Sequence, residues 1–226
     1  MALARYKDLC VDVVDEAMMT PFWAQVLGLD VRVHDDGDAQ LVGPTPQHGV
    51  WLNAVPEPHT VKQRVHLDVH ALSVGDVAAL GASVLPDWGP FPWTVMADPE
   101  GGELCVFERD EVPMYRLYEI GIDAVDAEAI GRWWADVLGT EAVVDDDHDT
   151  SFAVPGAPFD GFVFGAVAEP KTIKNRIHWD VDVAPGGIEA LAAAGASVLR
   201  RPDEQISWTV MTDPEGNEFC AFVTGD

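Results

Sequence analysis

Apolar and polar residues alternate along several short segments, as they do in β-strands that bury one face. In YKDLCVDVV (6–14) the aliphatic residues share one side, and two aspartates and a cysteine share the other. In RVHLDVH (64–70) two valines and a leucine share one side, and two histidines and an aspartate share the other. The same reasoning predicts further short strands at 29–34, 39–43, 49–55, 83–86, 92–97 and 103–107.

Between 15 and 27 the apolar spacing changes to three and four residues, which predicts an amphipathic helix. Asp15 is placed to cap the start of this helix, and Gly28 is placed to end it. A shorter helix is expected to end at Gly81. The pattern thus predicts a unit of one strand, one helix and three strands, followed by a second such unit.

This pair of units occurs twice in the chain. PEPHTVKQRVHLDV (56–69) returns as AEPKTIKNRIHWDV (168–181), and WTVMADPEGGELCVF (93–107) returns as WTVMTDPEGNEFCAF (208–222). The order of the matching segments is kept, so we interpret the chain as a tandem duplication of a small domain.

The seam between the copies is ERDEVPMY (108–115), which is charged and contains a proline. Such composition is typical of a linker. We therefore expect one domain at 1–110 and a second at 116–226.

Each copy also carries the tetrapeptide Asp-Pro-Glu-Gly, at 98–101 and 213–216. Aspartate, proline and glycine stand where a type I hairpin turn with a bulge requires them. In that register Val95 lies opposite Cys105, and Trp93 lies opposite Phe107. The turn itself is expected to be structural, since it sets which side chains share a face.

The polar sides of the strands gather the residues capable of chemistry. The apolar sides must receive the helices, so the polar sides should form a concave surface that faces away from them. On this surface we place the candidate ligand-binding residues Asp8, His66, Asp68, Trp93, Cys105, Glu119, His178, Asp180, Trp208 and Cys220.

Composition narrows the class of partner. The 226 residues include 39 acidic and 13 basic ones, and the formal net charge is −26. So acidic a surface repels nucleic acids and anionic membranes and attracts cations. Three cysteines without CxxC spacing, an N-terminus that turns acidic early, and the lack of a long apolar run favour a soluble cytoplasmic protein with reduced thiols.

The motifs FWAQVLGL, RVHLDV and MADPEGGELCVF, with their copies WWADVLGT, RIHWDV and MTDPEGNEFCAF, resemble the vicinal oxygen chelate superfamily. That superfamily includes glyoxalase I, bleomycin-resistance proteins and extradiol dioxygenases, and the likeness is strongest to its actinobacterial glyoxalase-like subfamily. The resemblance implies an α+β fold with two tandem glyoxalase-like domains. Each domain would consist of two βαβββ units that form a curved, cup-shaped mixed sheet with helices on the convex face. The chain would then be a monomer that imitates the family's homodimer, or would itself form a homodimer.

The resemblance also implies places for a divalent metal ion, which metal-dependent members hold with His, Gln and Glu. The corresponding places hold Asp8, His66 and Cys105 in one copy, and Glu119, His178 and Cys220 in the other. A carboxylate, an imidazole and a thiol are able to bind zinc, nickel, manganese or iron. A thiol in the carboxylate place departs from the family pattern, so no metal is assigned from the sequence.

Two functions stay open. One is a bleomycin-resistance-like protein whose cups bind a small aromatic or cationic molecule, for resistance or sequestration, through Trp93, Trp208 and the nearby acids. The alternative is a metal-dependent lyase, isomerase or dioxygenase in which His66 or His178 is a ligand or a general base. These residues could also have purely structural roles. Each tryptophan would then pack in the core, and each histidine would hydrogen-bond to its neighbouring aspartate.

A cluster of basic residues precedes the central strand of each copy, at Lys62, Arg64, Lys174 and Arg176. These residues stand out in so acidic a chain. Ion pairs between the units and the binding of an anionic group are the two interpretations.

Overall fold

The computed structural model describes residues 2–35, 37–86, 89, 91–146 and 148–225, and its elements repeat one order four times. The first unit consists of β1 (Arg5–Val13), α1 (Glu16–Leu27), β2 (Asp30–Val33), β3 (Ala39–Val42) and β4 (Val50–Ala54), with a 3-10 turn at Pro46–His48. The second consists of β5 (Val65–Ala71), α2 (Val74–Ala79), β6 (Ser83–Val84), β7 (Thr94–Ala97) and β8 (Glu103–Glu108).

The second copy repeats this order. Its first unit consists of β9 (Leu117–Ala124), α3 (Ala127–Leu138), β10 (Val143–Val144), β11 (Thr150–Phe152) and β12 (Gly161–Ala166). Its second consists of β13 (Ile177–Val183), α4 (Gly187–Ala193), β14 (Ser197–Arg200), β15 (Thr209–Thr212) and β16 (Glu218–Val223). The predicted α+β fold with duplicated βαβββ units is confirmed. Among the described residues, no helix is both long and apolar enough to cross a bilayer.

Local sequence sets the ends of the long helices as expected. The Asp15 side chain accepts a hydrogen bond of 3.0 Å from the Met18 amide, and Gly28 ends α1 with φ +69°. Asp126 and Gly139 do the same for α3. The residues capping these helices are therefore the ones that the sequence indicates.

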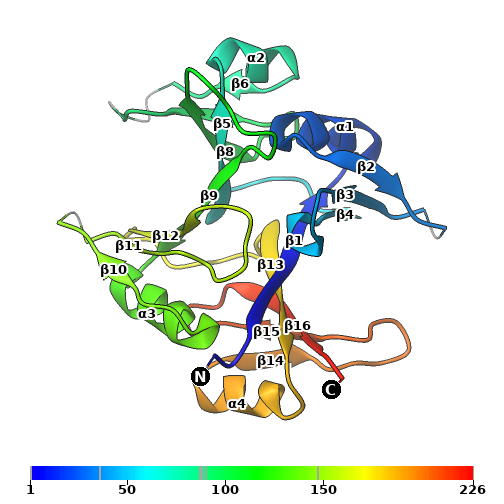
Figure 1. Cartoon of the computed structure of the whole chain (residues 1–226), viewed down its shortest axis with the longest axis vertical. Coiled ribbons are helices and arrows are strands. Elements are labelled where there is room, and N and C mark those ends of the chain that lie inside the picture. Colours follow the sequence, from blue (N-terminus) through cyan, green and yellow to red (C-terminus); the bar gives the residue numbers. More distant parts are fainter. Residues whose placement is uncertain (1, 36, 87–88, 90, 147, 226) are drawn as a thin grey trace.

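Two eight-stranded sheets result, and each draws one unit from each copy. Sheet A has the order β14-β15-β16-β13-β1-β4-β3-β2, and sheet B has the order β10-β11-β12-β9-β5-β8-β7-β6. Figure 1 shows the exchange: the blue strand β1 lies beside the yellow strand β13, although they come from opposite ends of the chain. The expected division at 108–115 therefore separates the two sequence copies, but it does not separate the sheets.

Antiparallel pairs between the copies hold each sheet together at its centre. In sheet A, β1 pairs with β13, so that Leu9 lies opposite Trp179. In sheet B, β5 pairs with β9, so that Leu67 lies opposite Ile120. The backbone N–H and C=O groups of a buried strand must be hydrogen-bonded. At the centre of each sheet the other copy supplies these partners, so neither copy completes a sheet alone.

A single apolar core includes residues from both sheets. Trp134 of α3 shows how the helices contribute to it, since the ring lies 4.9 Å from Trp179 and 5.0 Å from Phe219 in sheet A. The same helix contacts β11 and β12 of sheet B. The predicted alternation is confirmed, because Leu9, Leu67 and Trp179 are fully buried on the faces that receive the helices.

The N-terminal segment and the linker contact equivalent glycines. A Cβ atom on Gly28 would come within 2.0 Å of the Met114 carbonyl oxygen in the linker. A Cβ atom on Gly139 would come within 2.8 Å of the Ala2 side chain. These helix ends thus require glycine both for positive φ and for the close passage of the chain.

The repeated Asp-Pro-Glu-Gly turns tie the sheets together through their glutamates. Glu100, in the turn between β7 and β8 of sheet B, accepts hydrogen bonds from the Val14 and Asp15 amides of the β1–α1 loop, at 2.7–2.9 Å. Its carboxylate also pairs with Arg176 of the sheet A half at 2.9 Å. Glu215 binds the Val125 and Asp126 amides in the same way. The equivalent arginine, Arg64, lies farther from Glu215, at 3.9 Å.

The hairpin register predicted for these turns is confirmed, with Val95 opposite Cys105.

We predict that Glu100→Ala destabilises the protein more than Glu215→Ala. Hydrogen bonds to a charged group contribute roughly 1.5–3 kcal/mol each, and only Glu100 has a close arginine as well. Thermal unfolding of the two variants measures the difference. Glu128→Ala is the matched control, since Glu128 forms an exposed i,i+4 pair with Arg132 at 2.9 Å. Equal losses in all three variants would contradict the role of the turns.

Candidate functional site

The polar faces of the two sheets hold two related groups of side chains, which we name cup A and cup B. Cup A consists of the residues on the polar face of sheet A around β1 and β13, namely Asp8, Cys10, His178, Asp180 and Cys220. Cup B consists of the equivalent residues of sheet B around β9 and β5, namely Glu119, Gly121, His66, Asp68 and Cys105. All ten sequence-predicted residues lie on these two faces, since Trp93 and Trp208 extend the rows of Cys105 and Cys220.

The structure groups the expected metal ligands differently from the sequence assignment. Asp8 lies opposite Asp180, beside His178 and Cys220, and not with His66 and Cys105. Glu119 lies opposite Asp68, beside His66 and Cys105, and not with His178 and Cys220. The reason is the pairing of opening strands between the copies. Each cup therefore needs both copies of the sequence.

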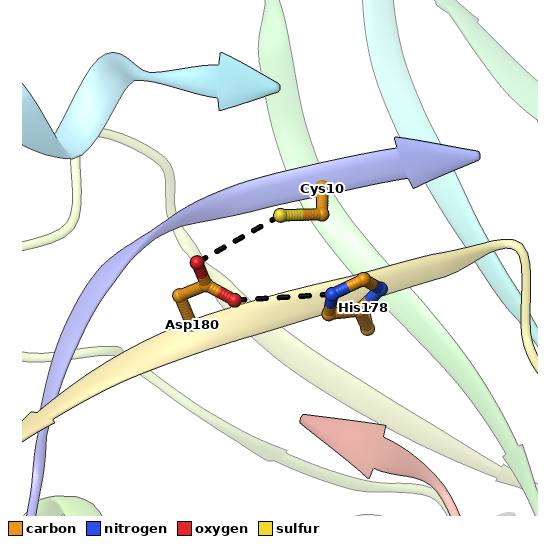
Figure 2. A group of neighbouring side chains, drawn as sticks. All are labelled: Cys10, His178 and Asp180. Carbon is orange, nitrogen blue, oxygen red and sulfur yellow. Dashed lines mark hydrogen bonds and ion pairs between the residues drawn. The ribbon is translucent and has the colours of Figure 1, made fainter. Parts of the chain in front are cut away.

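Cup A is a buried group of donors and acids. Figure 2 shows the Asp180 carboxyl between the Cys10 thiol and the His178 imidazole. The Cys10 sulfur lies 3.7 Å from Asp180 Oδ2, and His178 Nε2 lies 3.9 Å from Asp180 Oδ1. On the other side, the Cys220 sulfur lies 3.7 Å from His178 Nε2. Within the described part of the chain, His178 Nδ1 and Asp180 Oδ1 are buried without a hydrogen-bond partner.

Lys7 supplies a positive charge to cup A. Its ammonium lies 2.7 Å from Asp8 and 3.8 Å from Asp180, and 4.3 Å from the centre of the Phe222 ring. Strict alternation places Lys7 on the apolar side, so the sequence did not predict it. The register of β1 shifts between Tyr6 and Asp8, and this irregularity brings Lys7 to the acids.

The charge of cup A follows from its burial. Burial raises the pKa of the Asp180 carboxyl well above its usual value, and the charge of Asp8 raises it further. Burial also raises the pKa of the Cys10 and Cys220 thiols. Both cysteines are therefore thiols at neutral pH, which excludes an activated thiolate nucleophile in this cup.

In cup B a close pair between His66 and Asp68 takes the place of the contact between Cys10 and Asp180 in cup A. His66 Nε2 lies 3.2 Å from Asp68 Oδ1, and the Cys105 thiol completes a group whose ligand atoms lie within 4.8 Å of one another. Gly121 makes this possible, because a Cβ atom there would come within 2.3 Å of the His66 ring. The imidazole of cup B therefore extends over the position that Cys10 holds in cup A.

The pKa values of the two histidines shift in opposite directions as a result. Burial lowers the pKa of His178 to about 4, so this imidazole is neutral at pH 7. Burial alone would lower the pKa of His66 too. The charge of Asp68 and its hydrogen bond to the ring outweigh that effect and raise the pKa well above 6.5. One duplicated position thus holds an imidazole that loses its proton more readily in cup A and one that holds its proton more strongly in cup B.

Stacked rings border cup B along β7, β8 and β9. Trp93 stacks on Phe107 at 5.3 Å, and Phe107 contacts Tyr118 at 5.1 Å. The Arg109 guanidinium lies 5.4 Å from the Phe107 ring and 5.6 Å from the Tyr118 ring. In cup A the equivalent stack is Trp208 on Phe222, at 5.4 Å. The prediction that both tryptophans lie on the polar faces is confirmed, and the ring surface of cup B already accepts a cation.

A hollow lies beside the acid of each opening strand. The hollow of cup B has a volume of about 560 Å³ and is lined by three carboxylates, Glu119, Glu141 and Asp160, with the hydroxyls of Thr140 and Ser151. No basic residue of the described chain lines it. The hollow of cup A has about 310 Å³ and lies between Asp8, Arg32 and Gln40. Burial, and then the charges of Asp68 and Asp160, raise the pKa of Glu119 to about 7.

Both cups contain side chains that could ligate a metal ion. Cys10, His178 and Asp180 form one group and His66, Asp68 and Cys105 form the other, each with ligand atoms within 4.8 Å. Cup A fits a metal better, because its imidazole is neutral and three of its buried polar atoms, Asp8 Oδ1, His178 Nδ1 and Asp180 Oδ1, lack hydrogen-bond partners in the described structure. Next to the cup A group, the Trp51 indole of β4 donates a hydrogen bond to Asp8 Oδ2 at 3.3 Å.

Comparison with known proteins gives one consistent family. A family model described as a glyoxalase-like domain matches residues 8–107 and again 119–222. No curated protein sequence matches the chain.

Solved structures show the same fold at low identity. Glyoxalase I from Zea mays is 17% identical, with a TM-score of 0.69 over 97% of this chain and 92% of that one. A proposed dioxygenase from Bacillus subtilis is 14% identical, with a TM-score of 0.61 over 98% and 86%. The cppA protein from Streptococcus pneumoniae is 10% identical, with a TM-score of 0.51 over 98% and 100%.

We predict that the two cup histidines titrate far apart in an NMR pH titration. His178 should titrate near pH 4 and His66 well above pH 6.5. Because an unfolded histidine has a pKa of about 6.5, His178 reduces stability as the pH falls from 6.5 toward 4. His66 adds stability at low pH, and that stability is lost as the pH rises through its folded pKa. His178→Gln should therefore lessen the acid-induced loss of stability, and His66→Gln should not. Similar titration curves for both histidines would contradict the assignment.

Proposed function

This chain belongs to the glyoxalase-like family, and on that basis we propose that it binds a small organic cation in cup B. The observation that carries the proposal is the hollow of about 560 Å³ lined by Glu119, Glu141 and Asp160 with no basic residue among the described lining. Ligand sites of this size hold molecules of drug-like dimensions. A sequestering or resistance protein needs such a site and needs no reaction.

Electrostatics favour a cation over a neutral ligand. Burial is the first cause of the raised pKa of Glu119, and repulsion from the charges of Asp68 and Asp160 raises it further. A bound positive charge removes this repulsion. The net charge of −26 adds a long-range attraction that brings cations to the surface.

The stacked rings favour a cation with an aromatic or alkylated body. Tyr118 precedes Glu119 in β9 and contacts Phe107 at 5.1 Å, and the Arg109 guanidinium lies over both rings. A ligand cation would use the same ring faces by cation–π attraction, which contributes about 0.5–2 kcal/mol. The acid and the rings together would distinguish such a ligand from inorganic cations.

We predict that benzyltrimethylammonium binds the protein and that Glu119→Gln weakens binding about tenfold, or about 1.4 kcal/mol. Tryptophan fluorescence and calorimetry measure the affinity. Binding should strengthen between pH 6 and pH 8, since Glu119 with a pKa of about 7 becomes charged in that range. Glu189→Gln, an equal change of charge at the exposed helix α4, is the matched control. Benzyl alcohol binding as tightly as the cation, or no effect of Glu119→Gln, would refute the proposal.

A second candidate is a metal-dependent lyase, isomerase or dioxygenase, and the ligand group of cup A favours it. Cys10, His178 and Asp180 would hold a borderline ion such as zinc, and Lys7 would balance the charge of Asp8. A bound ion of this kind would polarise a carbonyl oxygen or lower the pKa of a bound water. The raised pKa values of Asp180 and Cys10 mean that binding would release protons, so affinity would rise with pH.

Metal analysis of the purified protein distinguishes the two candidates. If cup A is not a metal site, we expect the purified protein to contain well under one equivalent of zinc, nickel, manganese or iron. His178→Gln should then leave this metal content unchanged. One equivalent that is lost in both His178→Gln and Asp180→Asn, but retained in His66→Gln, would instead assign the metal-dependent function to cup A. Thermal shift on adding zinc gives an independent readout for each variant.

A further inference from the structure

A third cavity lies apart from both cups, where the two copies of the sequence meet. It has a volume of about 630 Å³ and is formed by residues 55–64, which lead into β5, and residues 173–176, which lead into β13, together with Asp12 of β1. The volume is within the range of small-molecule sites. Neither cup uses these segments, and three of the four basic residues that stand out in the sequence line the cavity.

The cavity is basic in a strongly acidic chain. Arg64, Lys174 and Arg176 all line it, although the whole chain has only 13 basic residues against 39 acidic ones. Asp12 and Glu57 also line it, and Asp12 pairs with Lys174. Lys174 is thus neutralised by Asp12 and Arg176 by Glu100, whereas Glu215 lies 3.9 Å from Arg64, and one incompletely neutralised cation suits a monoanion better than a dianion.

The two arginines occupy equivalent positions but differ in their partners. Arg176 donates to the Glu57 carbonyl at 2.6 Å and pairs with Glu100 at 2.9 Å. Arg64 donates to the Glu169 carbonyl at 2.6 Å, but Glu215 lies 3.9 Å from its Nη2. Its Nε and Nη2 atoms are buried with no hydrogen-bond partner among the described residues, and the side chain is only 12% exposed.

An unsatisfied guanidinium edge of this kind matches one ligand group closely. Nε and one Nη of arginine form a fork that binds the two oxygens of a carboxylate in parallel. Buried donors without acceptors are costly, so an arriving carboxylate would satisfy both at once. Only arginine can form these two parallel hydrogen bonds, because a lysine ammonium offers no such fork.

The rest of the lining indicates what the carboxylate would be attached to. Val55, Pro58, Val61 and Ile173 supply apolar surface, and Val61 and Ile173 are 43% and 46% exposed. Contact with an apolar body would cover them. We propose that this cavity binds a small monocarboxylate with an apolar body, through the free edge of Arg64.

The proposal is tested with benzoate, and with benzamide as its uncharged counterpart. Calorimetry and saturation-transfer NMR on the whole chain should show millimolar or tighter binding of benzoate and at least about tenfold weaker binding of benzamide. Arg64→Gln should weaken benzoate binding about tenfold or more. Arg64→Lys should fail to restore it, since the fork is lost. Arg132→Gln, at an exposed position of α3, should bind benzoate like the unmodified chain.

A second variant keeps the test decisive if Arg64→Gln unfolds. Ile173→Trp replaces a half-exposed side chain at the cavity and should block benzoate without lowering the melting temperature. Glu119→Gln in cup B should leave benzoate binding unchanged. The proposal is overturned if the unmodified chain does not bind benzoate, if benzamide binds equally well, or if Ile173→Trp binds benzoate as before.

Discussion

The antiparallel pairing of opening strands between the two copies is the constraint on which the rest of the structure depends. β1 pairs with β13 and β9 pairs with β5, so each sheet is completed by strands from both copies of the sequence. Buried strands require these backbone partners. Everything on the polar faces follows from the exchange, because it brings Asp8 to Asp180 and Glu119 to Asp68. The core follows as well, since α3 then packs between the two sheets.

Within that shared frame, a few side chains give the two cups different chemistry. Gly121 leaves room for the His66 ring to extend toward Asp68, whereas Cys10 fills the equivalent place beside Asp180. The charge of Asp68 raises the pKa of His66 in spite of its burial, whereas burial lowers the pKa of His178 to about 4. The ammonium of Lys7 adds a fixed charge in cup A only. The cups are thus alike in backbone and unlike in electrostatics.

The sequence predicted the secondary structure and the polar and apolar faces of the strands, because both depend on the local pattern of residues. Alternation placed His66 and His178 on the polar side, and the turn at 98–101 placed Val95 opposite Cys105. The same reasoning could not find which strands pair, since an apolar face is equally well buried by either partner. It also missed Lys7, because the irregularity in β1 breaks the alternation that the prediction relies on. The charge of each histidine depends on distances between side chains of different strands, which no local pattern contains.

The exchange of units between sheets has a genetic consequence. In a symmetric homodimer every substitution appears in both sites, so the sites cannot evolve separately. Here each cup is encoded by its own codons, so a substitution such as Gly121→Cys would alter cup B and leave the side chains of cup A unchanged. Because one chain carries both cups, equivalent positions such as Cys10 and Gly121 are free to differ.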